Sequence, residues 1–321
     1  MHPAFSVILF TVLSGAGLGA LVVAAVLDAA GVLGVGAVVG PTILARPAVA
    51  GLVLVAAGLG CSTLHLANPR NAWRSMARWR TSWLSREAAL ALVLLPVAAG
   101  YALALFRGAG AARVLVGLAV VLLAWAMLVC TAMIYASLKP IRQWHTRRVP
   151  VAFVLLGHAS GALVVLATLP ADLPGRPTLG GAAALLLLAA AVAKVEYWAF
   201  VARGVGVVTL EQAIGVAHGV RPPGPTGSVM AARLLDAGHT RGTFLTREFM
   251  AESASARRGA LRVAAVALGL VVPAALVLLA TSTAVAVVAL LSSAAGLVAE
   301  RWLFFADARH TVRLYHGDRT T

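Results

Sequence analysis

The chain has 321 residues, of which 61% are hydrophobic and 12% are charged, whereas soluble domains average about 45–50% and about 25%. This composition excludes a soluble globular protein and indicates an integral membrane protein. The formal net charge of +15 does not indicate a nucleic-acid-binding protein, because the basic residues of a membrane protein are expected first in its cytoplasmic loops.

Eight apolar runs are long enough to cross a bilayer, which takes about 20 helical residues. They cover residues 5–29, 47–67, 88–106, 114–138, 151–169, 179–201, 261–280 and 283–304. Only Thr281 and Ser282 separate the last two runs, which together are too long for one crossing, so we expect a tight hairpin there. The sequence predicts an all-α fold, an integral membrane bundle of eight transmembrane helices that forms a single domain over residues 1–321.

The side of the membrane follows from the basic residues. Eight crossings place both termini on one side, together with the second, fourth and sixth loops. That side receives 21 of the 26 Lys and Arg residues. Because basic residues are concentrated in cytoplasmic loops, we expect both termini and these three loops to be cytoplasmic.

Two of the loops on that side are distinctive. The second loop, residues 65–87, carries five arginines and three tryptophans between two apolar runs, which is typical of a membrane–water interface. Residues 202–259 form the longest hydrophilic stretch and contain three prolines and charges of both signs. Loops of this length are usually functional or bound to a partner, so we predict a packed cytoplasmic docking element, with a solvated loop as the alternative.

Ionisable residues inside the predicted helices are few, and each needs a reason because a charge at the bilayer centre costs about 2.5–3.5 kcal/mol on insertion scales. They are His65, Glu87, His158, Lys194, Glu196, Glu300 and Arg301. All of them fall in the cytoplasmic half or at its interface, and we expect none near the midplane or in the outer half. This one-sided distribution disfavours a transporter, whose path needs polar groups on both sides.

A quinone site is one function that these residues fit. Such a site needs an apolar slot and groups that exchange protons near neutral pH. His65 and Glu87, at the ends of neighbouring helices, are the leading candidates, and Arg70 and Arg86 are placed to keep the Glu87 carboxylate ionised. The alternatives are an interfacial histidine bonded to a carbonyl for His65, and a charge stabilised by the helix dipole for Glu87.

Lys194 and Glu196 are further candidates for quinone binding or proton transfer. Two residues apart on one helix, they do not share a face, so each is expected to find its partner on another helix.

Metal cofactors are not expected in this chain. Cys61 and Cys130 lie inside apolar runs and form no CxxC pair or Cys/His cluster, so neither an iron–sulfur cluster nor a structural metal is predicted. Haem is the rival cofactor, and it needs two axial ligands at matching depth. Only His65 and His158 satisfy that requirement in the sequence.

Several long strings resemble one family of proteins. They are HPAFSVILFTVLSGAGLG, STLHLANPRNAWRSMARWRTSWLSREA, TAMIYASLKPIRQWH, KVEYW, TLEQAIG and RLLDAGHTRGTFLTREF. Together they span the chain, which resembles the membrane anchor subunits of the dimethyl sulfoxide reductase type.

The resemblance implies an eight-helix anchor that has no redox metal of its own, binds ubiquinone or menaquinone and docks a four-cluster iron–sulfur subunit. That subunit in turn joins a molybdopterin catalytic subunit. The basic residues of the docking side are then candidates for contact with the iron–sulfur partner. These are Arg74, Arg78, Arg80, Lys139, Arg142, Arg241 and Arg247.

Similar anchors serve both sulfite dehydrogenases and S- or N-oxide reductases. In the family the partner docks on the side of loops two, four and six, which the basic residues place in the cytoplasm. This implies a bacterial inner-membrane protein of the sulfite-oxidising branch, which passes electrons to the quinone pool. The alternative is the anchor of an anaerobic sulfoxide reductase that oxidises menaquinol. A pure structural tether and a transporter are lower alternatives.

Overall fold

The computed structural model describes residues 4–35, 39–64, 69–204, 207–209, 255–279, 282–316 and 320–321. In these ranges the protein is helical, and eight spans are long and apolar enough to cross a membrane, as predicted. The elements are α1 (Phe5–Val32), α2 (Pro41–Thr63), η1 (Pro69–Arg78), α3 (Trp83–Phe106), α4 (Arg113–Ala136), α5 (Arg148–Thr168), α6 (Arg176–Ala202), α9 (Ser255–Val266), η2 (Ala267–Val271), α10 (Val272–Leu279), α11 (Thr283–Ala306) and η3 (Thr311–His316). Together α9, η2 and α10 form the seventh crossing.

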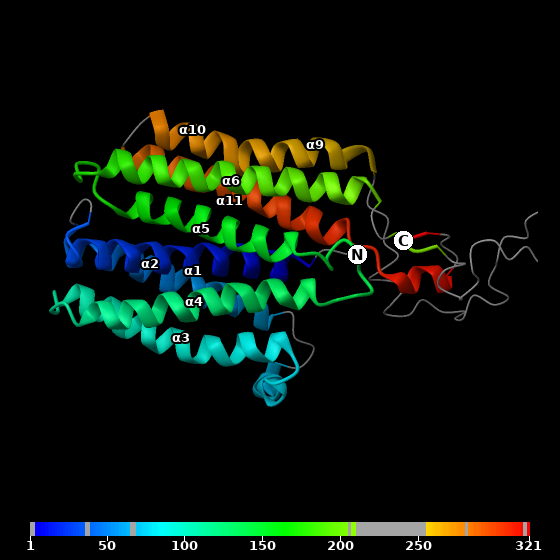
Figure 1. Ribbon diagram of the computed structural model, residues 1–321, viewed down its shortest axis with the longest axis horizontal. Helices are drawn as coiled ribbons and strands as arrows, with labels where there is room; N and C mark the ends of the chain where they lie inside the picture. Colours follow the sequence, from blue (N-terminus) through cyan, green and yellow to red (C-terminus); the bar gives the residue numbers. More distant parts are fainter. Residues whose placement is uncertain are drawn as a thin grey trace, which may run out of the picture.

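The spans lie side by side in an elongated bundle, with α3 and α4 at one edge and α9 and α10 at the other (Figure 1). Helix α1 begins and α11 ends at the same end of this bundle, as an even number of crossings requires. We call this the proximal end and the other the distal end. The last residues are tied to the proximal end, because Thr321 N donates to Val208 O at 3.1 Å.

Most of the helices begin before the apolar runs that predicted them, whereas α2 ends at Thr63, before the predicted end at residue 67. Helix α2 begins at Pro41, with Pro47 inside it, and α3 begins at Trp83 behind Ser82, whose side chain accepts a hydrogen bond from Ser85 N. Hydropathy marks the apolar stretch, whereas caps mark where a helix begins. Glu87 therefore lies in the second turn of α3, not at its first residue.

Glycines let α1 approach its neighbours closely. A Cβ added at Gly19 would collide with the carbonyl oxygen of Gly157 on α5, and one added at Gly161 would collide with the Gly19 carbonyl carbon. In a membrane no hydrophobic force brings helices together, so close backbone packing between small residues takes that role. Helix α1 thereby packs against α5 in the interior of the bundle.

The seventh crossing contains a π-helical segment, η2, which Pro273 explains. Proline has no N–H, so it cannot bond Gly269 O four residues back or Leu268 O five residues back. Two serines of α11 bond these carbonyls instead, Ser293 to Gly269 O and Ser292 to Leu268 O, each at 2.8 Å. The irregular backbone is thus satisfied by a neighbouring helix, as hydrocarbon requires.

The distal half of the bundle holds buried charge, so the expectation of none there was wrong. Asp28 of α1 is 1% exposed and accepts hydrogen bonds from Arg113 at 2.7 Å and 3.0 Å and from the Tyr101 hydroxyl at 3.1 Å. Arg176 donates to carbonyl oxygens at the end of α5, including Leu166 O at 2.9 Å. One-sided charge is therefore no longer an argument against transport.

Two predictions lie mostly outside the described residues. The docking element of residues 202–259 falls almost entirely in the range that is not described, and the hairpin between α10 and α11 falls at residues 280–281. Both stay predictions, although α10 and α11 do pack against each other.

Candidate functional site

A cavity of about 400 Å³ lies at the proximal end between α2, η1 and α3, within the usual range of small-molecule sites, about 300–1,000 Å³. Its walls are mostly apolar. They consist of Leu59, Ser62, Thr63, Trp73, Met76, Leu84, Glu87, Ala88, Ala91, Leu92 and Leu95. Among these described lining residues, Glu87 is the only ionisable one, so any proton exchange with a molecule in this cavity falls to Glu87 or to a neighbour outside the described ranges.

Glu87 is buried and bonded to a threonine of the next helix. Its exposed fraction is 4%, as is that of Thr131 on α4, and Thr131 Oγ1 is hydrogen-bonded to Glu87 Oε1. The same hydroxyl lies 3.0 Å from Met127 O. A hydroxyl has one proton but two lone pairs, so it donates to only one of these oxygens at a time.

This arrangement accommodates both forms of Glu87. When the carboxyl group is ionised, Thr131 donates to it. When the carboxyl is protonated, Glu87 donates to Thr131 Oγ1, and the threonine proton turns to Met127 O. Neither state leaves a buried donor without an acceptor, so Glu87 is able to gain or lose a proton with little rearrangement.

Arg86, next to Glu87, bonds the backbone of the turn that precedes α3. Arg86 donates to Trp79 O at 3.0 Å and to Arg80 O at 2.7 Å, and lies over the Trp83 ring. The described part of the chain contains no ion pair between Glu87 and either Arg86 or Arg70, which is exposed. Their proposed electrostatic role is therefore not supported, and contact with a quinone stays a prediction.

His65 lies outside the described residues, so its role also stays a prediction. Helix α2 ends at Thr63, which lines the cavity.

The element η1 and the two residues that follow it present aromatic and basic groups together. Trp73 and Trp79 are 63% and 57% exposed, with the guanidinium groups of Arg74 and Arg80 over their rings at 5.4 Å and 5.6 Å. Exposed tryptophans with arginines are typical of the membrane interface. Trp73 also lines the cavity, so this element covers one side of the candidate site.

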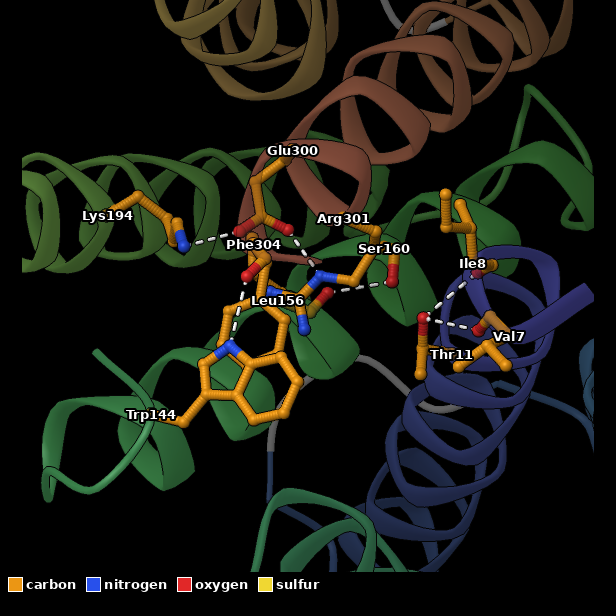
Figure 2. Close-up of polar contacts among 10 residues, drawn as sticks. All are labelled: Val7, Ile8, Thr11, Trp144, Leu156, Ser160, Lys194, Glu300, Arg301 and Phe304. Atoms are coloured by element: carbon orange, nitrogen blue, oxygen red, sulfur yellow. Dashed lines mark hydrogen bonds and ion pairs between the residues drawn. The ribbon is translucent and has the colours of Figure 1, made fainter. Parts of the chain in front are cut away.

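Lys194 lies away from this cavity, in a charged cluster in the core. It forms an ion pair with Glu300 of α11, which also pairs with its neighbour Arg301 (Figure 2). All three side chains are at least 95% buried. Aromatic rings surround the cations: Lys194 lies 4.2 Å from the Tyr197 centroid and Arg301 lies 4.2 Å from that of Phe153.

Glu196 is exposed and pairs with Arg148 of α5 at 2.7 Å. The prediction that Lys194 and Glu196 find separate partners on other helices is thus confirmed. The structure brings neither of them to the cavity beside Glu87.

His158 uses both ring nitrogens. Trp125 Nε1 donates to His158 Nε2 at 3.0 Å, and Nδ1 lies 2.8 Å from Val154 O, so the neutral tautomer with a proton on Nδ1 satisfies both bonds. Among the described residues, no three His, Cys, Asp or Glu side chains gather as metal ligands would.

The docking candidates within the described ranges lie at the proximal end and are exposed. They are Arg74 and Arg78 of η1, Arg80 of the turn between η1 and α3, and Lys139 and Arg142 of the turn between α4 and α5. Arg241 and Arg247 lie outside those ranges. The proximal end thus presents at least five cations to a partner.

Sequence reasoning missed Thr131 and the pair formed by Asp28 and Arg113. A threonine inside an apolar run carries no signal of its own, because it commonly bonds its own helix. Asp28 was visible in the first run, but its burial depends on Arg113, 85 residues away.

Two comparisons with known proteins point to the same family. The model of the DMSO reductase anchor subunit (DmsC) family matches residues 1–306. The chain is 35% identical over 337 residues to a sulfite dehydrogenase subunit of Allochromatium vinosum, covering 98% of this chain and 99% of that protein. No solved structure matches.

Proposed function

The chain belongs to the DMSO reductase anchor subunit family, and from this premise we propose that it is the quinone-reactive anchor of a molybdopterin and iron–sulfur oxidoreductase. As a member it is a multi-pass membrane anchor of a multi-subunit oxidoreductase. In our proposal it passes electrons between a four-cluster iron–sulfur subunit and the quinone pool, in the direction of sulfite oxidation.

The cavity between α2, η1 and α3 carries this proposal. A quinone needs an apolar slot for its ring and an opening toward lipid for its tail. The cavity has apolar walls, and Leu84 and Leu92 on its rim are 49% and 60% exposed. A redox-active quinone also exchanges protons when it exchanges electrons, and Glu87 lines the cavity for that purpose.

Glu87 handles the proton in this scheme. With a quinone bound, the protonated carboxyl donates to a quinone oxygen instead of to Thr131 Oγ1, and Thr131 then donates to the carboxylate that remains. His65, next to the end of α2, is the proposed second proton donor. The apolar walls exclude water from the ring, which strengthens the hydrogen bonds made there.

The direction is supported by the relative and by the charge of the chain. The relative that covers almost the whole chain is named as a subunit of a sulfite dehydrogenase. Basic residues at the proximal end favour a cytoplasmic partner. The family description favours the alternative, a sulfoxide reductase that oxidises menaquinol. In that case Glu87 accepts the proton. Assays of sulfite-dependent quinone reduction and of quinol-dependent sulfoxide reduction by the purified complex distinguish the two.

Glu87→Gln tests the site. General acid–base groups contribute about 10²–10⁴-fold, so we expect quinone-linked turnover to fall by about 100-fold in the assembled complex. Turnover with a soluble artificial acceptor should not change, because that acceptor bypasses the quinone cavity.

Glu196→Gln is the matched control, since this carboxylate is exposed and lies away from the cavity. Retention of full quinone-linked turnover by Glu87→Gln would refute the assignment. If titration of the purified complex with quinone detects no binding, the chain has no quinone site, and a purely structural tether is the function that remains. Solute uptake by the isolated chain in liposomes would support a transporter.

A further inference from the structure

A second, smaller cavity lies between α1, α4, α5 and α11, one hydrogen bond away from Glu87. Its volume is about 30 Å³, and a water molecule needs about 10–15 Å³ on this measure. Its polar lining is formed by Thr11, Ser14, Thr131, Ser160 and Arg301. This space accommodates one or two water molecules and is too small for an organic ligand.

The hydroxyl groups of this cavity are arranged as acceptors. Thr11, Ser14 and Ser160 each donate to carbonyl oxygens of their own helix, three or four residues back, at 2.6–3.2 Å. Each hydroxyl proton is used within the helix, so the lone pairs remain available to a donor in the cavity.

Arg301 supplies an unpartnered donor at the same place. Its Nε bonds Glu300, but its Nη2 is buried and has no hydrogen-bond partner among the described residues. The Arg301 guanidinium lies 4.2 Å from the centroid of the Phe153 ring, and both residues line the cavity together with Ser160 and Thr11. A buried donor of a charged group that stays unsatisfied is strongly unfavourable.

We infer that this cavity holds ordered water, bonded to Arg301 Nη2, which strengthens the hydrogen bond that the Thr131 hydroxyl donates to Glu87. The water accepts from Arg301, so its own protons face the acceptor oxygens around it. Donation to Thr131 Oγ1 uses a lone pair of that oxygen and polarises its O–H group, so the hydrogen bond that this hydroxyl donates to the Glu87 carboxylate becomes stronger. Arg301 is then a positioning residue that acts through water and Thr131.

The surroundings of Glu87 agree with such a link. Tyr135 of α4 lies within electrostatic range of both Glu87 and Arg301, and Cys130 lies within range of Glu87 and Arg86. Among the described residues that line the Glu87 cavity from α2, η1 and α3, Glu87 itself is the only ionisable one. Among the described residues that line the small cavity, Arg301 is the only ionisable one.

The water site itself is tested by a high-resolution structure of the assembled wild-type complex. We expect density within hydrogen-bond distance of Arg301 Nη2 and Thr131 Oγ1. An empty cavity, at a resolution that shows other buried water, overturns the inference. This outcome does not depend on whether the larger cavity binds quinone.

The effect on turnover rests on the proposed function and is tested by variants that do not touch Glu87. Ser160→Val places methyl groups in the cavity and displaces water, and Thr11→Val removes one acceptor without a change of volume. Losing the water weakens donation to the Glu87 carboxylate, so its ionisation needs a higher pH. We expect the limb of the pH–rate profile that Glu87 controls to shift upward by about half a unit or more in Ser160→Val, and by less in Thr11→Val.

Thr168→Val is the matched control, because Thr168 makes the same bonds to carbonyls three and four residues back but lies at the distal end of α5. Turnover with the soluble acceptor reports assembly of each variant. If Ser160→Val and Thr11→Val give the profile of Thr168→Val, the link to Glu87 is refuted. If Glu87→Gln keeps its quinone-linked turnover, the proposed function fails, whereas the water site stands.

Discussion

Glu300 pairs with two cations in the core of the bundle, Lys194 from α6 and Arg301 from its own helix. The cluster therefore carries a net charge of +1 among aromatic rings, and its stability depends on the single carboxylate. Removing one partner of a buried ion pair is more unfavourable than the pair is favourable, because an uncompensated charge is left in a low dielectric. The three residues are thus not equivalent.

Glu300→Gln is expected to destabilise the protein by about 3–5 kcal/mol, since it leaves two buried cations side by side. Lys194→Met should be milder, because Glu300 then keeps Arg301 as a one-to-one partner. Thermal unfolding in detergent measures both, with Glu196→Gln as the exposed control, where about 0–1 kcal/mol is expected. An equal or larger loss in Lys194→Met would contradict this account.

At the scale of elements, the seventh crossing depends on α11 for its backbone hydrogen bonds. Pro273 removes the donor for two carbonyls of η2, and Ser292 and Ser293 supply hydroxyls in its place. A Cβ added at Gly296 would collide with the backbone nitrogen of Gly269, so the two helices are also in close backbone contact here. The π segment and the interface with α11 therefore form together.

Ser293→Ala should destabilise the protein by about 0.6–2 kcal/mol, the range for hydrogen bonds between membrane helices. In the background of Pro273→Ala the same change should cost less, because an alanine in place of the proline restores an N–H for Gly269 O. A double-mutant cycle by thermal unfolding measures this coupling. Additive effects would show that the serine does not compensate for the proline.

At the scale of the whole molecule, charge and cavities are concentrated toward the proximal end. The Glu87 cavity, η1 and the exposed cations at Arg74, Arg78 and Lys139 all lie there, whereas the distal end contains the matched pair of Asp28 and Arg113. A partner that delivers electrons at the proximal end reaches the quinone over a short distance. We therefore expect the docking face and the quinone site to share one side of the membrane.

A reporter fused to the C-terminus should read cytoplasmic, because 21 of the 26 basic residues lie in segments on the predicted cytoplasmic side. A fluorescent protein that folds only in the cytoplasm and alkaline phosphatase, active only in the periplasm, give opposite signals. In agreement, the catalytic partner should lack a twin-arginine export signal. Active phosphatase at the C-terminus would reverse the topology and favour the sulfoxide reductase alternative.

The crossings of this protein were predictable from the sequence, because the length of an apolar run and the position of arginines reflect transfer between water and hydrocarbon, which depends on local composition. Glu87 and Lys194 were recognised as candidates for the same reason, as ionisable groups in apolar runs. What each of them does there was not predictable in the same way.

The partners were decided only by the tertiary structure. Thr131 lies 44 residues from Glu87 and Arg113 lies 85 residues from Asp28, and such pairs form only when helices pack with a particular rotation and register. Packing depends on glycines such as Gly19 and on the π-helical segment at Pro273. The effect of these residues appears only when a neighbouring helix packs against them. The sequence by itself determined that carboxylates enter the membrane, whereas the fold decided that Asp28 is neutralised by an arginine and that Glu87 faces a cavity.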